Sequence, residues 1–123
     1  MAQESTFQTK IIKYLESQGA YVLKYNASGI SKTGVPDLIA CVNGVFVAIE
    51  VKAPNGVVSK LQEYNLKQIH NAGGVGLILY PKGFDEFKKI INILNKTDKS
   101  GKKVQWRRWC DLCPKNYLII NKK

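Results

Sequence analysis

The feature that most constrains this chain is residues 34–52, where two apolar runs lie on either side of Asn43-Gly44. An Asn-Gly pair between β-branched and other apolar residues is the strongest short-range signal for a two-residue hairpin turn. With these two as the turn residues, opposed positions add up to the same number, and Asp37 faces Glu50. Their Cβ atoms would then be roughly 5 Å apart. Lys52 lies two residues beyond Glu50 and points to the same face of the sheet.

Two carboxylates directly opposite each other destabilise a sheet, so the repulsion must be offset. A divalent cation held by both would do this, and oxygen ligands suit Mg²⁺ or Mn²⁺. A lysine beside the cation could orient or deprotonate water, or stabilise charge on a phosphate. The alternative is a hairpin with a solvated charged end, although the two apolar runs hold no other charge. We therefore predict a metal site at Asp37, Glu50 and Lys52.

Pro36-Asp37 followed by Glu50-Val51-Lys52 resembles the motif of the PD-(D/E)XK nuclease superfamily. A longer pattern is more narrowly similar to the VRR-NUC (virus-type replication-repair nuclease) family. That pattern comprises Gly34–Leu38, Ala48–Pro54, Ser59, Gln62 and Gly73-Gly74. The resemblance implies an α/β, restriction-endonuclease-like fold with a mixed central β-sheet flanked by helices. It also implies that the main-chain carbonyl of Val51 is an extra metal ligand.

Glu4 begins an expected amphipathic helix over residues 4–18 and has two interpretations. A first-turn acid complements the helix dipole. The resemblance implies instead a third acidic group at the metal site, since VRR-NUC relatives carry a glutamate near the start of this helix. Other branches of the superfamily have it one turn later, where this chain has Gln8.

Gln62 also has two interpretations. Ser59 looks like the N-cap of a helix over residues 60–71, and Gln62 three positions later completes a capping box. Gln62, Leu66 and Ile69 also share one inward stripe of that helix, which makes Gln62 a candidate site residue. The resemblance points to the same residue.

The remaining pattern predicts alternating strands and helices around the hairpin. Residues 20–25 read as a strand, 26–34 as a loop, 75–80 as a buried strand, and 84–94 as a second amphipathic helix. A strand, a helix and a buried strand in succession suggest a crossover with parallel pairing. His70 is expected on a helix surface.

Composition favours a polyanionic partner. The 123 residues suit one domain and carry a net charge of +10, which points first to nucleic acid and second to an acidic membrane surface. No run is long enough to span a bilayer, and the N-terminus lacks the features of a signal peptide. Three cysteines do not suggest a disulfide framework. We expect an intracellular protein with reduced thiols, in the cytoplasm of a bacterium or a phage-infected host, or associated with the nucleoid.

The C-terminal extension, residues 96–123, is basic and contains Trp106 and Trp109. Such a segment suits phosphate contact and base stacking, but residues 104–106 and 117–120 equally fit final strands of the sheet. Cys110 and Cys113 form a lone CxxC without the further ligands of a zinc site. Candidate DNA-binding residues are Lys32, Lys60, Lys102, Lys103, Arg107 and Arg108.

The function we predict is that of a Mg²⁺-dependent DNA endonuclease. The resemblance further implies action on branched DNA, such as a Holliday junction or a flap, in replication, repair or a phage context. It suggests a homodimer if four-way junctions are cut. One alternative is a non-catalytic nucleic-acid-binding module with the same fold, and another is an interaction or inhibitor protein with an incidental charged hairpin.

Overall fold

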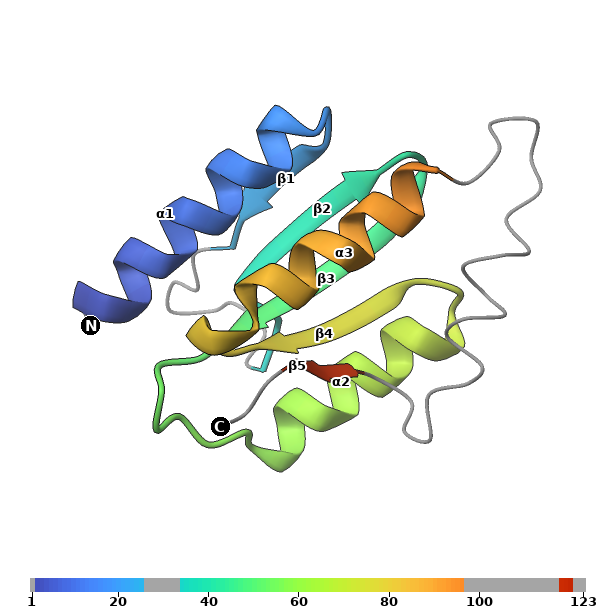
Figure 1. The fold of residues 1–123 in the computed structure, drawn as a ribbon. Coiled ribbons are helices and arrows are strands. Elements are labelled where there is room, and N and C mark those ends of the chain that lie inside the picture. The colour runs from blue at the N-terminus through green and yellow to red at the C-terminus, as the bar shows by residue number, and fades with distance from the viewer. Residues whose placement is uncertain (1, 26–33, 97–117, 121–123) are drawn as a thin grey trace.

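The computed structural model describes residues 2–25, 34–96 and 118–120, and they form a mixed five-stranded sheet flanked by helices (Figure 1). The elements are α1 (Ala2–Ser17), β1 (Tyr21–Lys24), β2 (Leu38–Val42), β3 (Val45–Val51), α2 (Lys60–Asn71), β4 (Val75–Leu79), the short 3₁₀ helix η1 (Pro81–Gly83), α3 (Phe84–Asn95) and β5 (Leu118–Ile120). The strand order is β1-β2-β3-β4-β5. The pairs β1/β2 and β2/β3 are antiparallel, whereas β3/β4 and β4/β5 are parallel. The predicted α/β class is confirmed.

The predicted hairpin and its register are confirmed. Val42 pairs with Val45 and Leu38 with Ile49. The turn residues Asn43 and Gly44 have φ angles of 50° and 82°. Both angles lie in the left-handed region, which Asn and Gly tolerate best. A two-residue hairpin turn needs this conformation at both positions to match the right-handed twist of its strands. The Asn43 side chain also donates a hydrogen bond to the carbonyl oxygen of Leu94 at 3.0 Å, which fastens the turn to the end of α3.

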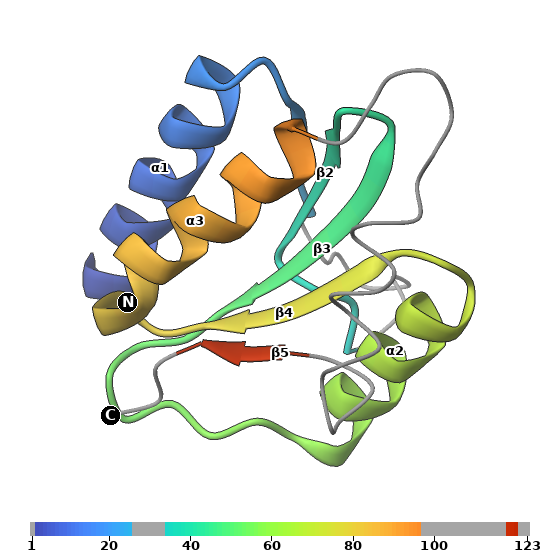
Figure 2. The same ribbon diagram turned by 45° about the vertical axis from the view of Figure 1, so that its right-hand side comes forward.

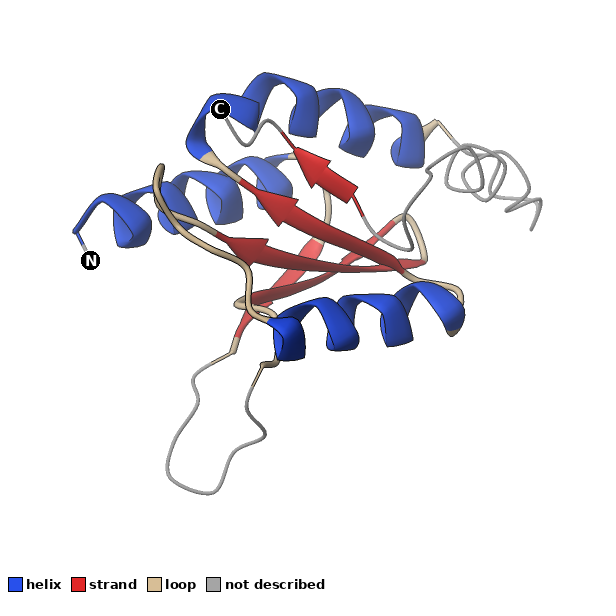
Figure 3. Ribbon diagram, turned by 90° about the horizontal axis from the view of Figure 1, so that it is seen from below, coloured by secondary structure: helices blue, strands red, loops and turns tan. Residues whose placement is uncertain are grey.

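Helices cover the two faces of the sheet unequally. Helices α1 and α3 lie on one face and α2 on the other (Figure 3). The larger core lies under α1 and α3, where Phe7, Ile11 and Leu15 of α1 are buried at the spacing expected of an amphipathic helix. A smaller buried cluster of Leu66, Ile78 and Tyr80 lies under α2. The side chains of β3 are buried at every position except Phe46, as suits a central strand.

The order and directions of the strands bring the start of α1 to a particular end of the sheet. Strands β1 and β3 run the same way, since each is antiparallel to β2. Helix α1 precedes β1 through a short connection and runs back along the sheet. Its N-terminal end therefore lies at the end of the sheet where β3 finishes, as Figure 2 shows.

The predicted start of α2 and the crossover that follows are confirmed. Ser59 is the N-cap and forms a capping box with Gln62. Strand β4 pairs in parallel with β3, so that Glu50 lies beside Ile78. The end of the basic extension belongs to the sheet as β5, which agrees with the alternative of a final strand. Within the described residues, no helix is both long and apolar enough to cross a membrane.

Candidate active site

Asp37 lies one residue before β2, and hydrogen bonds hold both its side chain and its main chain in place. The register of the hairpin continues to place it opposite Glu50. Its Oδ2 accepts a hydrogen bond of 2.9 Å from the main-chain N–H of Val51, and its main-chain carbonyl accepts one of 2.9 Å from Tyr25. The carboxylate is thus fixed against β3, one residue from Glu50.

Glu50 points to the α2 face of the sheet and is only 4% exposed. Its Oε2 accepts a hydrogen bond of 2.6 Å from Gln62 Nε2. The same oxygen lies 3.7 Å from Lys52 Nζ. A buried carboxylate is costly unless it is paired and hydrogen-bonded, and the amide and the ammonium group supply both kinds of contact.

Lys52 follows β3 directly, and its side chain is 11% exposed. Its main-chain N–H donates to the carbonyl of Leu79 at 3.0 Å, which continues the pairing with β4 beyond the strand. Its Nζ donates to the carbonyl of Val57 at 2.9 Å and to Gln62 Oε1 at 2.9 Å. The ammonium group is therefore enclosed between the loop after β3 and the first turn of α2.

Gln62 joins the helix cap to the charged pair. Its Oε1 accepts from the Ser59 N–H at 3.0 Å as well as from Lys52, and its own N–H donates to Ser59 Oγ at 3.1 Å. Its Nε2 donates to Glu50. The two interpretations of this residue are therefore compatible, because one amide caps α2 and contacts both Glu50 and Lys52.

Two supporting residues escaped sequence reasoning. Buried Asn65 donates from Nδ2 to the carbonyl oxygens of Gly34 at 2.9 Å and Leu61 at 3.0 Å, which ties the segment before Asp37 to α2. Asn65 lies three residues after Gln62 on the same inward side of the helix, and this polar residue on the inward side was the available signal. Buried Tyr80 donates from its hydroxyl to the carbonyl of Gly56 at 2.8 Å. Its position at the end of an apolar strand predicted burial but not this contact.

The structure places Glu4 through its main chain alone. It lies in the first turn of α1, at the end of the sheet where β3 finishes, but α1 covers the face opposite α2. Its side chain is outside what the structure describes. Gln8, one turn later, is buried, with 8% of its surface exposed.

Lys60 is the one proposed DNA-binding residue that the described ranges include, and it is exposed at the first position of α2. His70 lies on α2 and is half-buried. The other residues predicted for DNA contact or considered for zinc lie outside the described residues. They are Lys32, Lys102, Lys103, Arg107, Arg108, Cys110 and Cys113.

The donor chemistry at the end of β3 fits a hard divalent cation. Asp37 and Glu50 offer carboxylate oxygens, and the Val51 carbonyl would add a neutral one, which is the set that Mg²⁺ or Mn²⁺ prefers. In residues 2–25, 34–96 and 118–120, no group of three or more His, Cys, Asp or Glu side chains is placed to hold a metal ion. The fit therefore depends on two carboxylates, main-chain oxygen and water.

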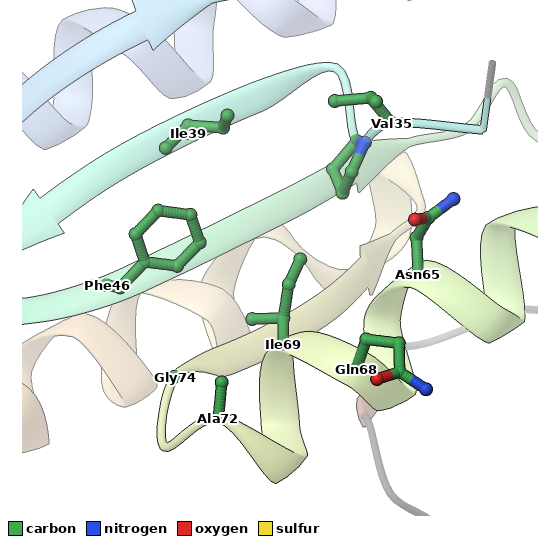
Figure 4. Close-up of a pocket in the computed structure, with 9 residues that line it drawn as sticks. Val35, Ile39, Phe46, Asn65, Gln68, Ile69, Ala72 and Gly74 are labelled. Atoms are coloured by element: carbon green, nitrogen blue, oxygen red, sulfur yellow. The ribbon is translucent and has the colours of Figure 1, made fainter. Parts of the chain in front are cut away.

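An apolar pocket of about 420 Å³ lies next to this site, between the hairpin and α2 (Figure 4). Pro36 lines it and directly precedes Asp37. Its other lining residues are Val35, Ile39, Phe46, Asn65, Gln68, Ile69, Ala72 and Gly74. Apolar groups dominate this lining, so the pocket is chemically distinct from the carboxylate site.

Comparison with known proteins agrees with this geometry. Residues 2–106 match the family model described as archaeal Holliday junction resolvase (Hjc). The solved structure of Archaeoglobus fulgidus Hjc, a Holliday junction resolvase from an archaeal hyperthermophile, is similar, with a TM-score of 0.51 and 20% sequence identity. The match covers 62% of this chain and 66% of that one, just under two thirds of its length.

No curated protein matches the chain. At 20% identity, the structural likeness establishes the fold, which is the expected restriction-endonuclease-like fold. The family model covers most of the sequence. The chain therefore belongs to the archaeal Holliday junction resolvase (Hjc) family, within the PD-(D/E)XK nuclease superfamily.

Proposed function

We propose that the chain is a Mg²⁺-dependent endodeoxyribonuclease that hydrolyses phosphodiester bonds in branched DNA, with the four-way junction as its preferred substrate. The observation that carries the proposal is the contact of Gln62 with both Glu50 and Lys52 in a buried site, beside the anchored Asp37. Asp37, Glu50 and Lys52 are the charged residues of the motif, from the start of β2 and the end of β3, and Gln62 joins the latter two from α2. The narrower likeness to the VRR-NUC family remains a prediction from the sequence pattern of residues 34–38, 48–54, 59, 62 and 73–74.

In this proposal Asp37 and Glu50 would hold Mg²⁺, with the Val51 carbonyl as an additional ligand, and Glu4 would act directly or through water. A bound divalent cation supplies an activated water, polarises the phosphate and stabilises the leaving oxygen. Lys52 orients the attacking water or assists its deprotonation. Its Nζ lies 3.7 Å from Glu50 Oε2, so a water molecule beside that carboxylate is within its reach.

A panel of labelled DNA substrates tests this function. We expect cleavage of a four-way junction in Mg²⁺, weaker cleavage of flap and splayed-arm substrates, little cleavage of plain duplex, and none in EDTA. Salt-sensitive binding of the junction in Ca²⁺ without cleavage in Mg²⁺ or Mn²⁺ would favour the non-catalytic binding module. Neither binding nor cleavage would favour the interaction protein.

We further propose that the active form is a homodimer. A four-way junction is approximately two-fold symmetric and needs two cuts, so two copies of one site suit it. An apolar surface is available on the α2 side of the sheet, where cross-strand neighbours Tyr21, Cys41 and Phe46 are all exposed. Leu23, at 51% exposure, lies beside Ile39 on the same surface, which adjoins the apolar pocket. Exposed apolar patches of this kind often mark protein interfaces.

Sedimentation velocity measurements test the dimer. Phe46, which is 48% exposed and lines the pocket, would be buried between the two copies. We expect Phe46→Lys to yield a monomer at concentrations where the wild type is a dimer. Ile93→Lys, at an exposed position of α3 on the opposite face, is the matched control and should remain a dimer. A wild-type monomer, or a Phe46→Lys dimer, would contradict this assignment.

A further inference from the structure

The loop after β3, residues 53–58, accepts hydrogen bonds from Lys52 and from Tyr80, the residue that follows β4. Its Val57 carbonyl accepts the hydrogen bond from Lys52 Nζ, although the Val57 side chain is 82% exposed. Gly56 packs on the lysine stem, since a Cβ added there would lie 3.1 Å from Lys52 Cδ and 3.2 Å from Lys52 Cβ. The position of the ammonium group thus depends on the position of this loop.

Tyr80 reaches the same loop from inside the protein. Its ring is 2% exposed in the cluster with Leu66 and Ile78, and its hydroxyl donates to the Gly56 carbonyl at 2.8 Å. Burial raises the pKa of the hydroxyl above its ordinary value of 10.0. Tyr80 therefore keeps its proton at neutral pH and remains a hydrogen-bond donor.

We propose that Tyr80 is a positioning residue for Lys52: its buried hydroxyl holds the Gly56 carbonyl, and the loop then holds the lysine ammonium beside Glu50 and Gln62. This inference rests on the proposed nuclease function for its effect on the rate. Its structural part concerns only Tyr80, the loop and Lys52. The Tyr80 hydroxyl bonds to the Gly56 carbonyl and the Lys52 ammonium group to the Val57 carbonyl, so the hydroxyl acts on Lys52 through the main chain of residues 56 and 57.

Tyr80→Phe tests the inference, because it keeps the buried ring and removes only the hydroxyl. We expect junction affinity in Ca²⁺ to stay unchanged, while the single-turnover cleavage rate in Mg²⁺ falls roughly ten- to a hundredfold, as small misplacements of catalytic groups do. Tyr14→Phe is the matched control. It removes a tyrosine hydroxyl bonded to the carbonyl of Lys88 on the opposite face, and it should cleave like the wild type.

The structural part has its own measurement, which needs no cleavage. Brief acetylation of the metal-free protein with an amine reagent, followed by peptide mass spectrometry, reports how accessible Lys52 is relative to exposed Lys60. Lys52 should react slowly in the wild type and in Tyr14→Phe, and several times faster in Tyr80→Phe. Gly56→Ala, which presses a methyl group on the lysine stem from the loop side, should change Lys52 reactivity and slow cleavage as well.

Two results would overturn the inference. One is a Lys52 labelling rate in Tyr80→Phe equal to that of the wild type, which would mean that the hydroxyl does not hold the loop. The other is faster labelling with an unchanged cleavage rate, which would mean that the positioning has no effect on the chemistry. A wild-type protein that cuts no DNA would overturn the nuclease function instead, and the labelling rates would still decide whether Tyr80 positions Lys52.

Discussion

The Val51 N–H and Asp37 Oδ2 form a hydrogen bond of 2.9 Å that joins the two halves of the motif. Asp37 precedes β2, whereas Val51 ends β3, 14 positions later in the chain. The contact directs the Asp37 carboxylate toward Val51, the residue next to Glu50, rather than into solvent. The aspartate therefore has a structural role in the hairpin in addition to its proposed role as a metal ligand.

Substitutions of Asp37 separate these two roles. Asp37→Asn keeps an oxygen that can accept from Val51 but loses the charge, whereas Asp37→Ala loses both. We expect the alanine variant alone to lose about 1.5–3 kcal/mol of unfolding free energy in EDTA, the value of one hydrogen bond to a charged group. Both variants should lose the rise in melting temperature that Mg²⁺ causes in the wild type, because a ligand that binds the folded state stabilises it. A wild-type Mg²⁺ shift in Asp37→Asn would show that this carboxylate is not a ligand.

Comparing Gln62→Ala with Ser59→Ala distinguishes the site from the cap. Both variants break the capping box and should lose roughly 1 kcal/mol of stability in urea unfolding. Only Gln62→Ala also removes the contacts with Glu50 and Lys52, so its single-turnover cleavage rate should fall roughly ten- to a hundredfold. Equal cleavage rates in the two variants would leave Gln62 with the capping role alone.

Gly34→Ala and Gly19→Ala test how tightly the segment before Asp37 packs. Both glycines have positive φ, at 76° and 85°, so each alanine pays a similar backbone penalty of about 1–2 kcal/mol. A Cβ on Gly34 would also lie 2.5 Å from Leu61 Cγ and 2.8 Å from Asn65 Nδ2, whereas one on Gly19 meets nothing within 4 Å. We expect Gly34→Ala to lose about 1–3 kcal/mol more in urea unfolding. Equal losses would mean that the packing against α2 is loose.

The basic extension is tested by salt dependence. Binding of junction DNA in Ca²⁺ should weaken steeply with salt, with a slope of about 0.9 for each phosphate neutralised. Arg107→Gln with Arg108→Gln should flatten that slope, and the same pair of changes at Lys102 and Lys103 should act alike. Lys88→Gln with Lys89→Gln, two exposed charges on α3, is the control and should leave it nearly unchanged. An unaltered slope in both extension variants would assign the extension to folding or to another partner.

The hairpin was predictable because its information is local. Asn43-Gly44 sets the turn and the turn sets the register, which runs to Leu38 and Ile49 and, continued by one residue, places Asp37 opposite Glu50. The capping box of α2 was predictable for the same reason, since Ser59 and Gln62 lie within one turn of each other. Each of these inferences needs only the spacing of a few neighbouring residues.

The contacts around Lys52 were not predictable, because they depend on where separate elements meet. The bond from Tyr80 to Gly56 spans 24 positions and that from Asn65 to Gly34 spans 31. Neither is visible without the crossover that seats α2 over β3 and β4. For the same reason, sequence alone could not decide between the two roles of Gln62. The place of Glu4 also depends on tertiary structure, since α1 covers the face of the sheet away from Glu50.

The most direct test is cleavage of a labelled four-way junction in Mg²⁺ by the wild type, Asp37→Ala and Lys52→Ala, with junction binding measured in Ca²⁺ for each. The wild type should cut the junction. Asp37→Ala should bind the junction as tightly as the wild type or more tightly, and Lys52→Ala should bind it with similar affinity. Each variant should cut the junction at least about a hundredfold more slowly than the wild type. Retained binding excludes a folding defect, and Glu4→Ala should lose less activity if that residue acts through water. Wild-type cutting by Asp37→Ala or Lys52→Ala would contradict the assignment of the nuclease site.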